Sequence, residues 1–321
     1  ESAMLGHVGT VDSARDLDIA RAVVGDDSLT YLGKSYGTLL GATYAELFPT
    51  RVGRMVLDGV LPANLDLVEI TEGQLDSFQQ VLGDFIRYCF DANGCPLQGT
   101  PEQAEQQLRD WVRSLDQSPL TSNGRELNEA LATYAIVSHL YFPADDYEPL
   151  RDALRAGMED GDAGPMLAIL DDRIRRGPDG KYLDNSTDAY YAVTCLDRPY
   201  EGSLDEVRSL AKEWDSRAPL FGASLAWGLL ACKDWPAAGE RITEVMAQGS
   251  NPILLVSPIH DPATPHVWAE QLADQLANAR LVTWDAVNHT AYREGSDCVD
   301  EVVDEYLVAG TAPADDVRCP S

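Results

Sequence analysis

The sequence is short of basic residues and long apolar runs, and each shortage excludes a class of protein. Only 24 lysines and arginines stand against 53 aspartates and glutamates among 321 residues, which gives a net charge of −29. A chain this acidic repels nucleic acid and anionic lipid, so we expect neither as a partner. No apolar run approaches the ~18 residues that a membrane-spanning helix needs, so we expect no membrane span.

The acidic excess itself has two interpretations. It can keep the protein soluble, or it can favour substrates that carry a positive group. Hydrophobic residues make up 45% of the chain and aromatic residues 8%, which is ordinary for a globular protein. A chain of this length and composition can bury a large core in one or two domains.

Six cysteines fall into three close pairs along the sequence. The pairs are Cys89 with Cys95, Cys195 with Cys232, and Cys298 with Cys319. An even count, short separations and loop-like surroundings favour disulfides, and therefore export to an oxidising compartment. Other pairings are open, and metal binding is a weaker alternative because no CxxC or HxxxH spacing occurs. No metal or organic cofactor is implied.

Apolar periodicity divides the chain into three parts. Residues 1–60 and 251–321 alternate short apolar runs with helical patterns, as a buried parallel sheet covered by helices requires. Residues 61–250 are dominated by helical periodicity, and we predict a large helical insertion, or cap. Strands of the sheet are predicted at residues 29–32, 54–57, 251–257 and 280–284. The fold class is therefore α/β, with its core interrupted by the cap.

The motif GKSYG at residues 33–37 follows the first predicted strand and precedes a helix, which is the setting of a nucleophile elbow. The sharp turn lifts the oxygen of Ser35 clear of the sheet, and a Cβ at either flanking glycine would collide with the strand or the helix. The helix N-terminus also favours the negative charge that develops during acyl transfer. A phosphate-binding P-loop is excluded, because it needs a glycine where Ser28 stands.

A serine nucleophile needs a base, and the base needs a carboxylate to orient it. In α/β-hydrolases the acid and then the histidine follow the serine, each after a core strand. Asp261 follows the strand at 251–257, and His289 follows the strand at 280–284. Both lie at carboxyl strand ends, where open α/β sheets place their sites. We therefore predict a catalytic triad of Ser35, Asp261 and His289.

The other four histidines fit the role of base less well. His7 precedes the first helix, His139 lies in the helical part, and His266 opens a helix. His260 shares a loop with Asp261, so it is poorly placed to reach Ser35.

Several motifs resemble those of the secreted tripeptidyl aminopeptidase family. They are GKSYGT (33–38), RMVLDG (54–59), DPATP (261–265), NHT (288–290) and, more loosely in the insertion, YYAVTCLD (190–197). The likeness covers both ends of the chain well and the insertion only in part. Together these motifs are specific for the family and less specific for its substrate.

The resemblance implies an α/β-hydrolase fold and exopeptidase chemistry on peptide substrates. Short peptides or single residues would be released from a free N-terminus through an acyl-enzyme, and the backbone N–H of Tyr36 would bind the oxyanion. Acidic groups in the cap of such enzymes commonly hold the substrate's ammonium group, and Asp197 is our candidate here. A surface or capping carboxylate is the simpler interpretation of Asp197.

The resemblance also marks what this sequence lacks. Family members carry strands, and a loop that supplies a second oxyanion donor, before the helix that begins here near Val11. Glu1 opens directly onto what reads as the middle of a domain, with no signal peptide. We therefore expect an N-terminal fragment of the same precursor, or residues that precede Glu1, to complete the sheet and the oxyanion hole.

Two rival functions use the same residues differently. An esterase or lipase would keep the triad but would not require a free amine on its substrate. A binding protein would keep the fold without catalysis, and a serine-directed phosphonate would then fail to label Ser35. We favour a secreted or envelope-associated serine exopeptidase.

Overall fold

The computed structural model describes residues 2–321 and contains two compact units. The first unit comprises Glu1–Gln74, Tyr191–Glu201 and Cys232–Ser321, and the second comprises Leu75–Tyr190 and Gly202–Ala231. The first unit holds a parallel sheet together with all the predicted site residues. The second is mostly helical. The division of the sequence into a core and a cap at residues 61 and 250 stays a prediction.

The first unit alternates strands with helices. Its elements are α1 (Ser2–Leu5), α2 (Thr10–Val23), β1 (Leu29–Lys34), α3 (Tyr36–Leu47), the 3₁₀ turn η1 (Pro49–Arg51), β2 (Val52–Asp58), β5 (Ile253–His260), α12 (His266–Gln275), β6 (Ala279–Val287), α13 (Asp297–Asp304), the π turn η3 (Glu305–Ala309) and β7 (Val317–Cys319). The four strands predicted from the sequence are therefore confirmed. Strands β1, β2 and β6 extend beyond their predicted bounds, whereas β5 both begins and ends later than the predicted range 251–257.

The remaining elements lie in the second unit or extend into it. They are α4 (Leu67–Asp91), α5 (Pro101–Gln117), β3 (Leu120–Ser122), β4 (Arg125–Leu127), α6 (Glu129–Ser138), α7 (Pro143–Glu159), α8 (Gly164–Arg173), α9 (Ser186–Asp197), α10 (Leu204–Arg217), α11 (Gly222–Gly228) and the 3₁₀ turn η2 (Leu229–Cys232). Helices α5 and α10 begin with capping boxes, in which Thr100 and Ser203 accept the backbone N–H three residues on.

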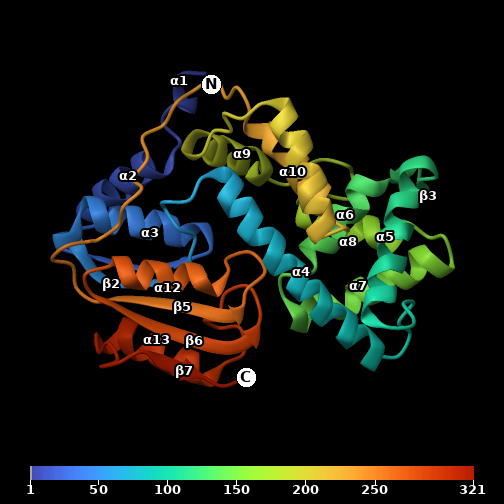
Figure 1. Cartoon of the computed structure of the whole chain (residues 1–321). Coiled ribbons are helices and arrows are strands. Elements are labelled where there is room, and N and C mark those ends of the chain that lie inside the picture. Colours follow the sequence, from blue (N-terminus) through green and yellow to red (C-terminus); the bar gives the residue numbers. More distant parts are fainter. Residues whose placement is uncertain (1) are drawn as a thin grey trace. The chain divides into compact units, whose positions relative to one another are not determined.

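The sheet of the first unit has the strand order β1-β2-β5-β6-β7, and every neighbouring pair is parallel. Helices α2, α3 and α12 pack on one face, where Met55 and Leu57 point, and α13 packs on the other face with Val56 (Figure 1). This alternation lets consecutive residues of β2 enter two different cores. Because all five strands run in one direction, their carboxyl ends share one edge of the sheet. The predicted α/β class is confirmed.

Three disulfides join the cysteines as predicted, at sequence separations of 6, 37 and 21 residues. The bond between Cys195 and Cys232 ties the end of α9 to the chain segment that leads back to β5. Bonds of this kind persist in oxidising compartments. Among residues 2–321, no helix combines the length and the apolar character needed to cross a membrane.

Candidate active site

Ser35 occupies a sharp turn between β1 and α3, and its backbone has φ 54° and ψ −120°. A positive φ is unusual for a residue with a Cβ, and such strain persists where the surrounding structure holds it. Part of that hold comes from the Ser35 N–H, which donates to the carbonyl of Asp58 at 2.9 Å. The serine is therefore raised at the N-terminus of a helix, as the GKSYG motif predicts.

The two glycines of the motif differ in how closely they are surrounded. A Cβ on Gly33 would lie 2.3 Å from the carbonyl oxygen of Gly37, inside the backbone of α3. A Cβ on Gly37 would meet only the hydroxyl of Tyr31, at 3.3 Å. A glycine is therefore strictly required at position 33, whereas Gly37 faces only the tip of a side chain.

Gly33→Ala is therefore expected to destabilise the protein by more than about 3 kcal/mol, since backbone atoms cannot move aside for the new methyl group. Gly37→Ala is the matched control, and it should change stability by less than about 1 kcal/mol because alanine also favours the helix. Thermal unfolding of both variants measures the difference. Equal unfolding temperatures would contradict the collision at Gly33.

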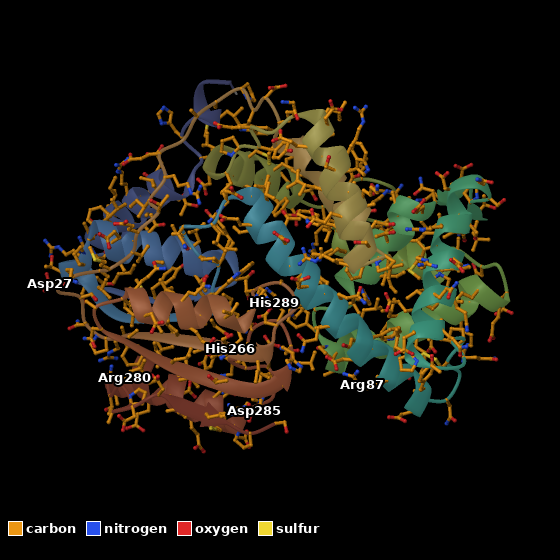
Figure 2. All side chains as sticks on the ribbon, in the orientation of Figure 1. Asp27, Arg87, His266, Arg280, Asp285 and His289 are labelled. Carbon is orange, nitrogen blue, oxygen red and sulfur yellow. A yellow bond between two sulfur atoms is a disulfide. The ribbon has the colours of Figure 1, made fainter. Side chains whose placement is uncertain are left out.

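Asp261 and His289 form a buried hydrogen-bonded pair after β5 and β6. The Nδ1 atom of His289 lies 2.9 Å and 3.1 Å from the two carboxylate oxygens of Asp261. Asp261 is 1% exposed and His289 is 6% exposed. Figure 2 shows Arg280, near the start of β6, and His289, beyond its end, at opposite ends of the sheet. A carboxylate so placed fixes the Nδ1–H tautomer and leaves Nε2 as the base.

The carboxylate of Asp261 is itself fixed by donors on both loops. It accepts hydrogen bonds from the backbone of Ala263 at 2.9 Å and from the backbone and hydroxyl of Thr264, each at 2.8 Å. The Thr290 N–H adds a further bond at 3.1 Å. These donors leave the carboxylate one orientation toward the imidazole.

The strand before Ser35 is tied directly to the loop after His289. The ammonium of Lys34 donates to the carbonyl of Tyr292 and to the carboxylate of Glu294, each at 2.6 Å. Residues 288–293, called the histidine loop below, are thereby anchored to β1, although β1 and β6 are not neighbours in the sheet. From the sequence alone, Lys34 has no assigned role in the site.

Asp58, at the end of β2, is a second buried carboxylate that the sequence argument missed. It is 0% exposed, and its oxygens accept the N–H groups of Ala291, at 2.9 Å and 3.0 Å, and of Tyr292, at 2.9 Å. Burial raises the pKa of Asp58 to about 7, against the effect of these two N–H groups and of the Lys34 ammonium. In the sequence, the position of Asp58 directly after a predicted buried strand could have indicated a site residue.

This raised pKa predicts how stability changes with pH. The folded protein binds the Asp58 proton more tightly than the unfolded chain, whose ordinary pKa is 3.8. The contribution of Asp58 to stability is therefore present below pH 3.8 and is lost as the pH rises to about 7. Relative to Asp58→Asn, the unfolding free energy of the unchanged protein should fall across this window by up to about 1.4 kcal/mol per pH unit. Urea unfolding of both proteins across this window measures it, and a constant difference would contradict it.

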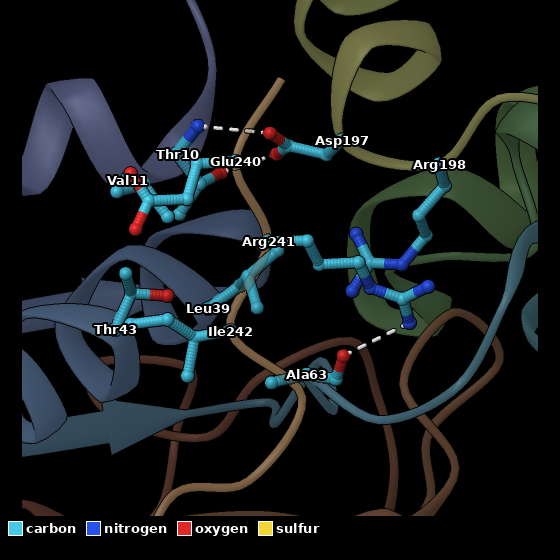
Figure 3. Close-up of a pocket in the computed structure, with 10 residues that line it drawn as sticks. All are labelled: Thr10, Val11, Leu39, Thr43, Ala63, Asp197, Arg198, Glu240, Arg241 and Ile242. Carbon is cyan, nitrogen blue, oxygen red and sulfur yellow. Dashed lines mark hydrogen bonds between the residues drawn. The ribbon is translucent and has the colours of Figure 1, made fainter. Parts of the chain in front are cut away.

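Asp197 lies in the first unit, at the end of α9, and is 5% exposed. Its carboxylate accepts the Thr10 N–H at 2.9 Å and also the Thr10 hydroxyl (Figure 3). The same hydroxyl lies 2.9 Å from that of Tyr36. Because a carboxylate only accepts, the Thr10 proton points to Asp197, and Tyr36 donates to Thr10. Asp197 is thus linked to the residue after the serine, through a threonine that the sequence argument did not single out.

Three of the other histidines lie near carboxylates outside the Asp261–His289 pair. The fourth, His260, is the last residue of β5 and does not lie in the loop with Asp261, as the sequence had suggested. His7 contacts Asp12 at 3.2 Å, and His266 lies 3.8 Å from Glu270 on its own helix. His139 lies 3.9 Å from Asp146 in the second unit. Within the described residues no group of three or more His, Cys, Asp or Glu side chains could hold a metal ion.

A parallel α/β sheet, a strained serine between strand and helix, and an Asp–His pair at later strand ends together define the α/β-hydrolase class. Comparison with known proteins supports this class. Residues 218–319 match the family model described as TAP-like protein. The match assigns residues 218–319 to this TAP-like family.

Proteins similar to nearly the whole chain carry different activity names. The chain is 36% identical over 327 residues to serine protease Hip1 of Mycobacterium tuberculosis, covering 98% of this chain and 62% of the relative. It is 35% identical to carboxylesterase B of the same organism, over 99% and 61% of the two chains. It is 30% identical to tripeptidyl aminopeptidase of Streptomyces lividans, over 98% and 59%. The chain thus spans about three fifths of the length of these relatives.

Proposed function

We propose that this chain carries the catalytic triad of a serine exopeptidase that acts on peptides with a free N-terminus. The carrying observation is the buried Asp261–His289 pair at the same sheet edge as the strained Ser35. Serine hydrolysis needs a nucleophile, a base and an orienting carboxylate, and these three residues supply them.

In this proposal Ser35 attacks the substrate carbonyl while His289 Nε2 takes the serine proton. The same proton then passes to the leaving amine, which departs and leaves an acyl-enzyme on Ser35. Water, deprotonated by His289, hydrolyses that ester and restores the serine. Asp261 keeps the imidazole in its tautomer and stabilises the imidazolium that forms transiently.

The oxyanion would be bound by the Tyr36 N–H, the first backbone N–H of α3, which has no acceptor within the helix. A second donor would come from an N-terminal fragment of the same precursor, or from preceding residues, that also pairs with β1, the edge strand of the described sheet. Absence of that donor costs roughly 10²–10³-fold in rate. Intact mass and N-terminal sequencing of the protein from its producer test this, and a lone fully active chain that begins at Glu1 would contradict it.

Two observations support the proposed preference for substrates with a free amine: the net negative charge of the chain and the name of one similar protein. A net charge of −29 attracts ammonium groups, and one relative is named a tripeptidyl aminopeptidase. Asp197 is the candidate carboxylate for the ammonium group. We place the protein outside the cytoplasm, because its three disulfides suit an oxidising compartment.

Hydrolysis of a tripeptidyl amide, its N-acetylated form and a short acyl ester tests the proposal. The exopeptidase should cleave the free peptide and lose most activity when the amine is blocked. Asp197→Asn should then impair the free peptide alone, whereas Thr10→Val, which keeps the carboxylate, should affect free and blocked substrates alike. Equal cleavage of free and blocked peptides would overturn the exopeptidase proposal.

The second candidate function is that of a carboxylic ester hydrolase. The 35% identity to a protein named carboxylesterase B favours it. The triad and the acyl-enzyme would be the same, and only the substrate would differ. Cleavage of the acyl ester with no cleavage of either peptide would support this candidate.

A further inference from the structure

The histidine loop contains two residues in an unfavourable backbone conformation, so contacts from other segments must stabilise it. Thr290 has φ 68° and Arg293 has φ 65°, both in the left-handed region that residues with a Cβ seldom adopt. Successive N–H groups in such a turn point toward one side and form a concave site for an anion. The anions here are two buried carboxylates of the chain itself.

Asp261 and Asp58 accept hydrogen bonds from different backbone N–H groups of the loop. Asp261 accepts the Thr290 N–H at 3.1 Å together with the imidazole Nδ1. Asp58 accepts the next two backbone N–H groups, those of Ala291 and Tyr292. The three consecutive N–H groups are thus shared in order between the aspartate of the triad and a second aspartate.

Asp58 also contacts the other half of the site. Its backbone carbonyl accepts the Ser35 N–H at 2.9 Å, and it pairs with Lys34 across β1 and β2. A single residue therefore bonds the serine turn through its backbone and the histidine loop through its side chain.

We propose that Asp58 is a positioning residue for catalysis: its carboxylate fixes the histidine loop at the distance from Ser35 that proton transfer requires. This inference rests on the proposed serine-hydrolase function. Asp261 orients the imidazole ring, whereas Asp58 orients the loop that carries the ring. Because Asp58 is fully buried, it acts through the loop and does not touch the substrate.

The charged groups that face Asp58 come from two other elements. Lys34 approaches from β1 and favours the ionised form, and Asp261 approaches from the end of β5 and opposes it. A protonated Asp58 would turn one acceptor into a donor against the loop N–H groups. The ionised carboxylate can accept the N–H groups of both Ala291 and Tyr292, although burial opposes its charge.

The test compares Asp58→Asn with the matched control Glu46→Gln. The Glu46 carboxylate also accepts two consecutive backbone N–H groups, of Met246 at 2.7 Å and Ala247 at 2.8 Å, but it lies on α3 away from the loop. Each substitution replaces a carboxylate by an amide of the same shape. Steady-state kinetics, phosphonate inactivation rates and the downfield proton resonance of the His289 Nδ1–H are measured in the protein as its producer makes it.

Asp58→Asn is expected to lower kcat and the inactivation rate about 10²-fold with KM unchanged, and to shift or broaden the Nδ1–H resonance. Glu46→Gln should leave all three as they are. A folded Asp58→Asn protein with unchanged kcat and an unchanged resonance would overturn the inference. If that variant does not fold, Asp58→Ser, whose hydroxyl can accept one N–H, takes its place with the same criteria.

Different measurements test the proposed function and the positioning role of Asp58, so one hypothesis can be wrong while the other is right. If the unchanged protein hydrolyses nothing and takes up no phosphonate, the function fails. The Nδ1–H resonance and the amide resonances of Ala291 and Tyr292 still report whether Asp58 fixes the loop. Resonances that do not respond to Asp58→Asn would then overturn the positioning role as well.

Discussion

Replacing Ser35 by alanine is expected to lower kcat by about 10⁶-fold and to leave the fold unchanged, because the proposed nucleophile is lost while its Cβ remains. Alanine carries the same Cβ at φ 54°, so the strain of the turn should not change. The helix N-terminus and the Tyr36 N–H remain to bind the oxyanion, which leaves a small residual rate over water. Initial rates on the best amide or ester substrate, with thermal unfolding alongside, measure both parts.

Ser28→Ala is the matched control for this prediction. Ser28 immediately precedes β1, at the end of the strand opposite to Ser35, and contacts no member of the proposed triad. It should retain full activity. A Ser35→Ala protein that keeps more than about one hundredth of the original kcat would remove Ser35 from the role of nucleophile.

Replacing Asp261 by asparagine is expected to lower kcat about 10⁴-fold, nearly as far as a loss of the base itself. An amide at this position offers one acceptor oxygen where the carboxylate offers two, although the Thr264 hydroxyl and the backbone N–H groups still need acceptors. The amide nitrogen can also favour the wrong tautomer of His289. The pH dependence of kcat and the rate of phosphonylation by a phosphonate measure this loss.

Asp285→Asn is the control for Asp261→Asn. Asp285 lies on β6 and pairs with Arg318 at 2.9 Å, so its loss removes an ion pair in the same sheet without touching His289. Its kcat should stay within about twofold of the original, since exposed ion pairs contribute little. Similar losses in both variants would mean that Asp261 acts through general stability and not through the imidazole.

The sheet and the proposed triad could be predicted because their signals are local. Short apolar runs mark the strands, the GKSYG motif marks the turn at Ser35, and Asp261 and His289 each follow a strand directly. Parallel strands then bring their carboxyl ends to one edge without any further information. The three disulfides were predictable for the same reason, since each links cysteines that are close in sequence.

The contacts that hold the site together could not be predicted in this way. From the sequence alone, Asp58 looks like the first residue of a turn. Its partner, the backbone N–H of Ala291, lies 233 residues further along the chain and meets it only in the folded protein. The Thr10–Asp197 bond spans 187 residues and joins two helices whose packing no local pattern specifies. Both are cases in which one polar side chain meets backbone groups that only the tertiary fold presents.

The most direct measurement is to map the adduct of a serine-directed fluorophosphonate by mass spectrometry, on the protein as purified from its producer. We expect a single phosphonylated peptide with the modification on Ser35, because the Asp261–His289 pair lies at the same edge of the sheet as this serine. A protein that takes up no phosphonate, or that carries it on another serine while Ser35 stays unmodified, would contradict the account.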